Sequence, residues 1–415
     1  MEAMAVQSTG IRVACAGMLI AAALVGCRED LLAPANGTCP GYCPPEQLQV
    51  VDSILLDNVA SDSAFTGYVQ PYAATSLQVY RDSTAAADAG SRAVATFLPF
   101  SDSLLIASAD TTRGAVIATD SFVVTLPLRR RNANTTGLEL AMYRVPVSTD
   151  SNTTFADLDP YFTDTTLIAV IPIADSVTSD TISVMVDAAA FPGFATDGNR
   201  GAVGVALRAP TGYVQLGSDD GQDGISLTRF VQVDSAGTSV PRREGKLPDF
   251  DSYVSTAGPM PGPDEREVGG APATRTMLRF ALPPRIADSS RVLRATLVLV
   301  PTGPVTGAPG DSLVVVAQGL NADVGAKSPL QGIPSDSVAL RVAFLPVGVA
   351  DTVRLDVTDL VIGWTRDSTR PRAFSVRAIP EGVAVATLRI GAASSGPARP
   401  RLHVTFVPPL TLGGR

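Results

Sequence analysis

Side chains that could carry out nucleophilic or acid–base catalysis are scarce in this sequence. His403 is the only histidine, and a serine nucleophile needs a histidine or an equivalent base beside it. His403 lies between Leu402 and Val404 in an alternating stretch, which places its ring on the solvent side of a strand. Among the 40 acidic residues, no motif brings two together as the paired carboxylates of a glycosidase. We therefore expect a protein that is not an enzyme.

One acidic loop has the residue types of a calcium site. The stretch 218–224 reads SDDGQDG and supplies Asp219, Asp220 and Asp223, and carboxylate oxygens are ligands that Ca²⁺ prefers. The spacing differs from that of an EF-hand, and Asp-Gly pairs are also common in ordinary turns. The sequence predicts a turn here, with calcium as the alternative, and it predicts no other cofactor.

Aromatic rings could bind sugars, because sugar faces rich in CH groups stack on them. Only 6% of the residues are aromatic. Trp364, the only tryptophan, follows two apolar residues at helical spacing, which predicts a buried position in a short helix that Thr358 could cap. Tyr68, Tyr72 and Tyr161 lie in loop-like contexts. We predict these three tyrosines as the candidate ligand-binding residues.

The most specific motif lies near the N-terminus. The apolar run 13–25 is shorter than the roughly 20 residues that span a membrane, and it has the length of a signal-peptide core. Its last residues, Leu24-Val25-Gly26, precede Cys27 and match the bacterial lipobox, in which the chain is cut before the cysteine and the cysteine is acylated. We predict that lipidated Cys27 anchors the protein to a membrane.

The residues after this cysteine predict the surroundings of the anchored protein. By analogy with sorting in diderm bacteria, Arg28 favours the outer membrane, on its periplasmic or its surface side. Residues 27–47 are rich in Pro, Gly and Ala and are typical of a short tether. Cys39 and Cys43 lie in this tether, in an oxidising compartment, which predicts a small local disulfide.

The overall composition favours an all-β protein. Hydrophobic residues make up 45% of the chain and charged residues 17%, so the chain is expected to fold. The 36 glycines and 32 prolines predict many turns, and no long stretch has apolar residues at helical spacing. The net charge of −8 argues against nucleic acid as a partner, because phosphate binding needs a basic surface.

The sequence contains two divergent copies of one pattern. Residues 180–187 resemble residues 351–358, and residues 201–218 resemble residues 372–389. The matching pieces occur in the same order, which predicts two tandem modules. The predicted organisation is a signal peptide at 1–26, a tether at 27–47, modules at 48–242 and 247–408, a linker at 241–245 and a tail at 409–415.

Alternating residues in the second copy predict its strands. Phe280, Leu355 and Phe344 fall on the apolar side of their stretches, and Arg279 and Arg354 on the polar side. Strands of this kind are stable only when two sheets pack face to face. We therefore predict two tandem β-sandwich domains with a jelly-roll-like architecture, and a module of about 160 residues should fold alone.

Several stretches of the second copy resemble the DNRLRE-type β-sandwich domains, which are classed among carbohydrate-binding modules of secreted and surface bacterial proteins. The stretches are DSYVSTAG at 251, RTMLRFALPPRI at 275, VLRATLVLV at 292, LDVTDLVIGW at 355 and RPRLHVTF at 399. The resemblance covers residues 251–407, whereas the first copy is only faintly similar. The Asn-Tyr-Gly element that is usual after the first strand is replaced by residues 258–270.

The resemblance and the lipobox together imply a function. They imply a lipid-anchored, non-catalytic protein of the cell envelope whose modules bind polysaccharide or mediate adhesion. The alternative is a structural or assembly lipoprotein that binds another envelope protein instead of sugar. Exposed aromatic rings would favour the first, and an exposed apolar patch or open edge strand would favour the second.

Overall fold

The structure is a computed structural model that describes residues 50–408 with internal gaps. The gaps are 56–57, 84–88, 108–110, 133–134, 192–198, 222, 257–259, 271, 289, 309, 321, 324–341 and 384. The predicted signal peptide, tether and tail lie outside the described residues, and so do Cys27, Cys39 and Cys43. The described residues group into one compact unit that begins at Val50.

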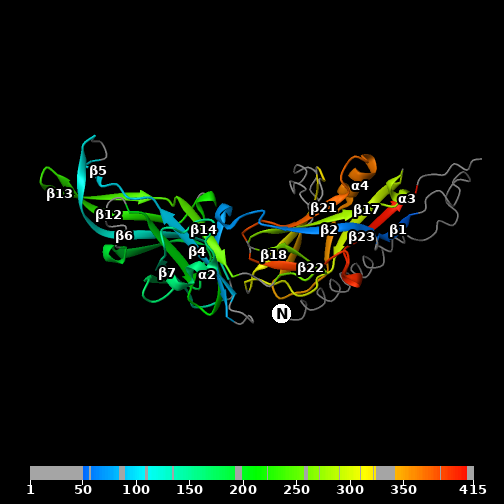
Figure 1. Ribbon diagram of the computed structural model, residues 1–415, viewed down its shortest axis with the longest axis horizontal. Helices are drawn as coiled ribbons and strands as arrows, with labels where there is room; N and C mark the ends of the chain where they lie inside the picture. Colours follow the sequence, from blue (N-terminus) through cyan, green and yellow to red (C-terminus); the bar gives the residue numbers. More distant parts are fainter. Residues whose placement is uncertain are drawn as a thin grey trace, which may run out of the picture. The chain divides into compact units, whose positions relative to one another are not determined.

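The fold is all-β and sandwich-like, as the sequence predicted (Figure 1). The first twelve strands are β1 (Val51–Leu55), β2 (Val59–Thr66), β3 (Ser76–Asp82), β4 (Ala89–Phe97), β5 (Ser103–Leu105), β6 (Arg113–Arg131), β7 (Leu138–Arg144), β8 (Leu167–Ile173), β9 (Asp180–Asp187), β10 (Gly201–Leu207), β11 (Thr211–Gly217) and β12 (Ser226–Ser235). The others are β13 (Thr238–Lys246), β14 (Phe250–Ser255), β15 (Glu265–Gly269), β16 (Thr274–Phe280), β17 (Arg291–Leu299), β18 (Ser312–Gly319), β19 (Ala343–Pro346), β20 (Val353–Asp356), β21 (Ala373–Ala378), β22 (Thr387–Gly391) and β23 (Arg401–Val407).

Helices are short and connect strands. The α-helices are α2 (Phe155–Leu158), α3 (Pro284–Ala287) and α4 (Thr358–Arg366), and the 3₁₀ turns are η1 (Pro71–Ala73), η2 (Asp159–Tyr161), η3 (Ala188–Ala190), η4 (Asp219–Gly221) and η7 (Gly396–Ala398). The helix predicted around Trp364 is α4. Its N-cap is Val357 and not Thr358, because the Thr358 hydroxyl is engaged elsewhere: it donates to Oδ1 of Asp356 at 2.7 Å and accepts from the Ala295 N–H at 2.9 Å.

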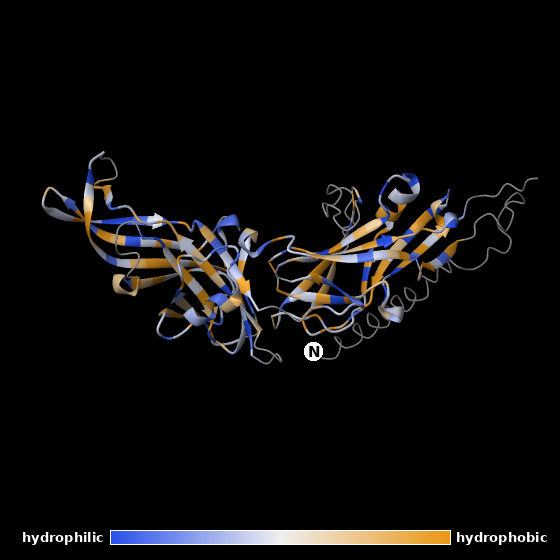
Figure 2. Ribbon diagram, viewed as in Figure 1, coloured by the Kyte–Doolittle hydropathy of each residue, from blue (hydrophilic) through white to orange (hydrophobic). Residues whose placement is uncertain are grey.

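The strands pair into two sandwiches, each with its own hydrophobic core. The first sandwich consists of β3–β14, in which one curled antiparallel sheet surrounds the core. The second sandwich consists of β1, β2 and β15–β23, in which a four-stranded sheet, β1-β23-β17-β20, packs on the sheet of β19, β18, β21, β16, β15, β22 and β2. Hydrophobic and hydrophilic residues alternate along the strands (Figure 2), as expected where one face is buried.

Most strands of the first sandwich have a counterpart with the same neighbours in the second. The matching pairs are β3·β4 with β15·β16, β3·β11 with β15·β22, β4·β10 with β16·β21, β7·β10 with β18·β21, β7·β8 with β18·β19, β6·β9 with β17·β20, and β6·β12 with β17·β23. The strand order of one sandwich therefore recurs in the other.

The predicted module boundaries do not coincide with the strand pairing. β1 and β2 fall inside the predicted first module, but they pair with β23 and β16 of the second. β14 falls inside the predicted second module, but it pairs with β4 of the first. The predicted linker, 241–245, lies within β13, an outer strand that pairs with β12. Proline and charged residues mark edge strands as well as linkers, so they do not distinguish the two.

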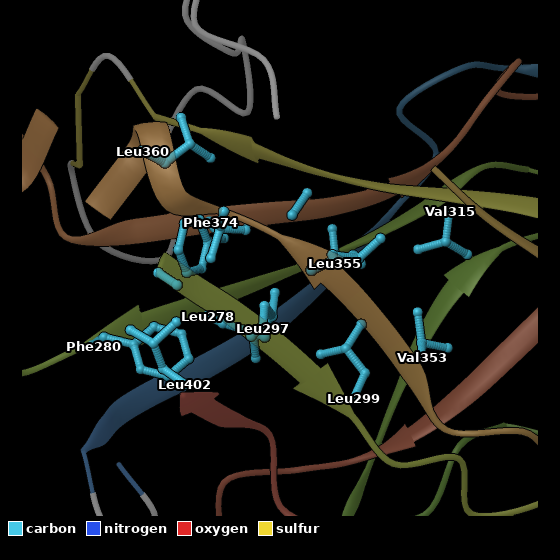
Figure 3. Packing of buried hydrophobic residues seen from close by; sticks show 14 of the residues in the cluster. Leu278, Phe280, Leu297, Leu299, Val315, Val353, Leu355, Leu360, Phe374 and Leu402 are labelled. Carbon is cyan, nitrogen blue, oxygen red and sulfur yellow. The ribbon is translucent and has the colours of Figure 1, made fainter. Parts of the chain in front are cut away.

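The second core contains most of the residues that alternation predicted, but Leu293, Val342 and Phe344 are exposed. Phe280 is 4% exposed, Leu355 is completely buried, and Trp364 is 3% exposed; Figure 3 shows Phe280 and Leu355 among the clustered side chains. The prediction was wrong for Phe344, which is 69% exposed, whereas its neighbour Leu345 is buried. Both residues are apolar and adjacent, so alternation could not assign the buried face of this strand.

Candidate functional site

The outward face of the four-stranded sheet is hollowed into an open depression. Its volume is about 480 Å³, and its lining comes from β1, β17, β20 and β23. Side chains alternate along each strand, so the polar residues between the buried ones reach this face. The side chains that decide its chemistry are Asp52, Arg294, Thr296, Arg354, His403 and Thr405.

Cross-strand pairing arranges these groups in rows. Thr405 lies opposite Asp52 on one side and Arg294 on the other, and its hydroxyl donates a hydrogen bond to Oδ1 of Asp52 at 2.5 Å. In the next row, His403 lies opposite Thr296. Directly opposite residues have Cβ atoms about 4.5–5.5 Å apart. The hydroxyls, the imidazole and a guanidinium therefore form one continuous polar surface.

His403 contributes a neutral ring to this surface. Partial burial lowers the pKa of the imidazole below its usual value, and the positive charges of Arg401 and Arg354 lower it further. At neutral pH one ring nitrogen is therefore a donor and the other an acceptor. The Nε2 atom is shielded from solvent and has no hydrogen-bond partner among the described residues, so this nitrogen is not itself accessible to a bound polar group.

Two exposed guanidinium groups on this face lack a partner. Arg294 and Arg354 are exposed, and within the described residues neither forms an ion pair or a hydrogen bond. A guanidinium presents its N–H donors in a planar fork that fits the oxygens of a carboxylate, sulfate or phosphate. The depression can therefore bind an anionic group, while neighbouring hydroxyls bind other polar groups of the same ligand.

No protein-family model and no curated protein sequence matches this chain. Across the part of the chain that the structure describes, no helix combines the length and apolar character needed to cross a membrane.

The three tyrosines predicted as ligand-binding residues lie on separate elements. Tyr68 follows β2, and its ring packs on the guanidinium of Arg275 at 3.7 Å. Tyr72 lies in η1 and Tyr161 in η2, and in the described structure neither contacts another aromatic ring. All three are between 37% and 43% exposed. They do not form one aromatic platform, and none of the described lining residues of the depression is a tyrosine, phenylalanine or tryptophan.

The acidic loop predicted as a calcium alternative is built as a turn. Asp219 and Asp220 lie in η4, whereas Asp223 forms an ion pair with Arg129 at 2.5 Å. The described residues contain no group of three or more His, Cys, Asp or Glu side chains that could hold a metal ion. The structure therefore gives no support to a calcium site at these three residues.

The basic run 129–131 is the end of β6, and each of its three arginines has a polar partner. Arg129 contacts Asp223, and Arg130 contacts the buried carboxylate of Asp311 at 3.2 Å. Arg131 is 4% exposed and donates to the carbonyl of Ala174 at 2.9 Å. These guanidinium groups are engaged by the protein's own carboxylate and carbonyl groups.

The η4 turn is held by a buried carboxylate that the sequence did not single out. Asp251 of β14 accepts hydrogen bonds from the Asp219 N–H at 2.9 Å and from the Ser218 hydroxyl at 3.3 Å. Burial, together with the charges of Asp219 and Asp220, raises the pKa of Asp251 to about 6 despite these two hydrogen bonds. At pH 7 the carboxyl is still mainly ionised, but its ionisation costs more free energy in the folded protein than in the unfolded chain.

This shift predicts a pH-dependent stability. The folded chain keeps the Asp251 proton up to about pH 6, whereas the unfolded chain loses it near pH 4, so the contribution of Asp251 to the free energy of unfolding falls as pH rises between these values. We expect Asp251→Asn to stabilise the protein, relative to wild type, by roughly 1–3 kcal/mol more at pH 7 than at pH 4. Urea denaturation at both pH values measures this difference.

Asp62 provides the matched control for this prediction. Its carboxylate forms an ion pair with Arg266 at 2.8 Å, so Asp62→Asn should destabilise the protein at pH 7 through the loss of that pair. An Asp251→Asn effect that is the same at both pH values would contradict the prediction.

Alternation pointed to part of this site before the fold was known. Arg354 and His403 fall on the polar sides of their strands in the sequence, as the structure confirms. The sequence did not indicate that Asp52 lies on the same face, because β1 and its partner β23 are separated by more than 300 residues in the sequence.

Proposed function

We propose that this protein is a lipid-anchored, non-catalytic component of a bacterial cell envelope that binds polysaccharide on the outward face of β1, β23, β17 and β20. The observation that carries the proposal is the pair of exposed guanidinium groups of Arg294 and Arg354 on an open polar depression, neither of which has a side-chain partner among the described residues. The resemblance of residues 251–407 to DNRLRE-type domains supports the same function.

The depression favours a polysaccharide that carries acidic groups. Each guanidinium can donate two hydrogen bonds to a carboxylate, and Thr296, Thr405 and His403 offer hydroxyl and imidazole groups beside it. The described lining supplies no aromatic ring, so stacking of sugar faces is not the source of affinity here. Retention should therefore weaken with added salt, which screens exposed charges beyond about 8–10 Å.

Arg294→Ala and Arg354→Ala should each weaken retention of the soluble chain, residues 28–415, by about tenfold, since a hydrogen bond to a charged group contributes about 1.5–3 kcal/mol. Affinity electrophoresis in gels containing polygalacturonate, with neutral dextran for comparison, measures this change. Arg291→Ala is the control, because Arg291 is an exposed arginine of the same strand outside the described lining. If all variants are retained equally, the binding site does not include Arg294 and Arg354. If neither polymer retains the folded wild-type protein, the proposal is wrong.

Membrane anchoring is tested separately through Cys27. Cys27→Ala should abolish incorporation of a fatty-acid analogue and should leave the chain unprocessed or release it from membranes, because several buried acyl chains provide the anchor. Metabolic labelling followed by membrane fractionation measures both. Equal labelling of wild type and variant would refute the lipobox assignment without touching the polysaccharide site.

A second candidate function is binding of another envelope protein. Phe344 is 69% exposed on β19, which is an outer strand of its sheet, and exposed apolar edges are typical of protein contact sites. A photo-crosslinking amino acid at position 344 distinguishes the two functions: crosslinks to one envelope protein, combined with no polysaccharide retention, would favour the assembly role.

A further inference from the structure

Each sandwich is completed by two strands that the repeated pattern would assign to the other sandwich. β1 and β2 lie ahead of the first sandwich in sequence but pair with β23 and β16 of the second. β13 and β14 lie ahead of β15–β23 in sequence but pair with β12 and β4 of the first. By their strand neighbours, β23 is the counterpart of β12, and β16 is the counterpart of β4. The pair β1–β2 therefore occupies the same place in the second sandwich as the pair β13–β14 occupies in the first. We call β1–β2 and β13–β14 the leading pairs, because each precedes the strands of one repeat in the sequence.

One contact that recurs in both sandwiches shows this equivalence at the level of single atoms. Asp251, in the Asp-Ser step of β14, accepts a hydrogen bond from the N–H of Asp219, just after β11. Asp62, in the Asp-Ser step of β2, accepts one at 2.6 Å from the N–H of Ala393, just after β22. Because β22 is the counterpart of β11, each leading pair docks on the opposite sandwich through the same carboxylate contact.

The topology is therefore that of two modules that have exchanged their leading strands within one chain. The exchange is noncovalent, through strand pairing, the Asp62 contact, and packing of Leu55, which is 2% exposed in the second core. β1 is the outermost strand of its sheet, and the only strand that pairs with β2 in the described structure is β16. Since β1–β2 precedes both sandwiches, it can leave its edge without threading the chain through a loop.

We propose that β1–β2 of one molecule also closes the second sandwich of another, which gives a reciprocal strand-exchanged dimer whose partner is a second copy of this chain. The contacts are the ones already made within a chain, so the dimer costs no contact at the docking edge. The nine-residue segment 67–75 between β2 and β3 keeps the donor near its own acceptor at an effective concentration on the order of millimolar. The exchanged dimer is therefore expected when chains fold at high local concentration. This inference does not rest on the proposed function.

Two single-cysteine chains test the proposal. One soluble chain, residues 28–415 with Cys39→Ser and Cys43→Ser, carries Ile54→Cys on β1 and an affinity tag; the other carries His403→Cys on β23 and no tag. Ile54 and His403 are directly paired, so a disulfide between the two chains forms when β1 of one lies on β23 of the other. The chains are mixed in denaturant, refolded together by dialysis at a series of protein concentrations that approaches millimolar, oxidised, and separated on non-reducing gels.

The matched control pair is Val298→Cys with Arg354→Cys, since these residues are paired between β17 and β20 within the second sandwich. A single chain carrying both Ile54→Cys and His403→Cys verifies that the geometry permits the bond. We expect the tagged–untagged disulfide at several times the control level, with a yield that rises with protein concentration during refolding. A yield no higher than the control, from chains whose circular dichroism is native, would overturn the proposal.

Discussion

A fragment of residues 247–408 is expected to remain without a cooperative unfolding transition, although it contains the whole predicted second module. It lacks β1 and β2, which close the edges of both sheets of the second sandwich. It also carries β14, whose partner β4 is absent. A chimeric chain that joins residues 50–66 to residues 262–408 through a flexible Gly–Ser linker should fold cooperatively, because it restores every strand of the second sandwich.

The expected difference is as large as the stability of a typical domain. Leu55 is almost completely buried and Val51 and Val59 pack on the same core, and burying one such side chain contributes about 1.5–3 kcal/mol. Two strands of hydrogen bonds are lost with them, each bond contributing about 0.5–1.5 kcal/mol. Together these losses approach the 5–15 kcal/mol by which domains are usually stable.

Circular dichroism and urea denaturation of the two chains measure this difference. A chain of residues 262–408 without the N-terminal strands serves as the control for the orphaned β14. If the 247–408 fragment unfolds cooperatively with the same midpoint as the chimeric chain, the leading strands are not needed and the fold has been assigned incorrectly at this edge.

Phe280→Ala and Leu355→Ala should each lower the free energy of unfolding by about 2–5 kcal/mol, since each leaves a cavity between the two sheets of the second sandwich. Phe280 contacts Phe374 edge-on, with ring centroids 5.6 Å apart, and Leu355 lies opposite Leu297. Arg354→Ala, next to Leu355 on the outward face, should cost less than about 0.5 kcal/mol.

Arg279 shows why exposure alone does not set such costs. It points away from the core, as alternation predicted, but it pairs with Asp323 through two hydrogen bonds of 2.6 and 2.9 Å. Arg279→Ala should therefore cost more than Arg354→Ala. Urea denaturation of the variants measures the series, and the reverse order between Leu355 and Arg354 would mean that the faces of β20 are inverted.

The all-β class and much of the second core follow from local pattern. Alternation identified the buried side of the strands that carry Phe280 and Leu355, because successive side chains of a strand point to opposite faces whatever the strand pairs with. It did not assign Phe344, where two apolar residues are adjacent. The same rule placed His403 and Arg354 outward, and these residues became part of the candidate site.

Strand partners were decided by packing between distant parts of the chain. Similarity between residues 180–187 and 351–358 reveals two related patterns, but it carries no information about which edge the leading strands close. The Asp-Ser steps at Asp62 and Asp251 are locally alike, and each carboxylate accepts a hydrogen bond from a backbone N–H of the sandwich on which it docks. The sequence determines which face of each strand is apolar and which is polar. Which strand it pairs with depends on sheet edges and chain connections that exist only once the sheets have formed.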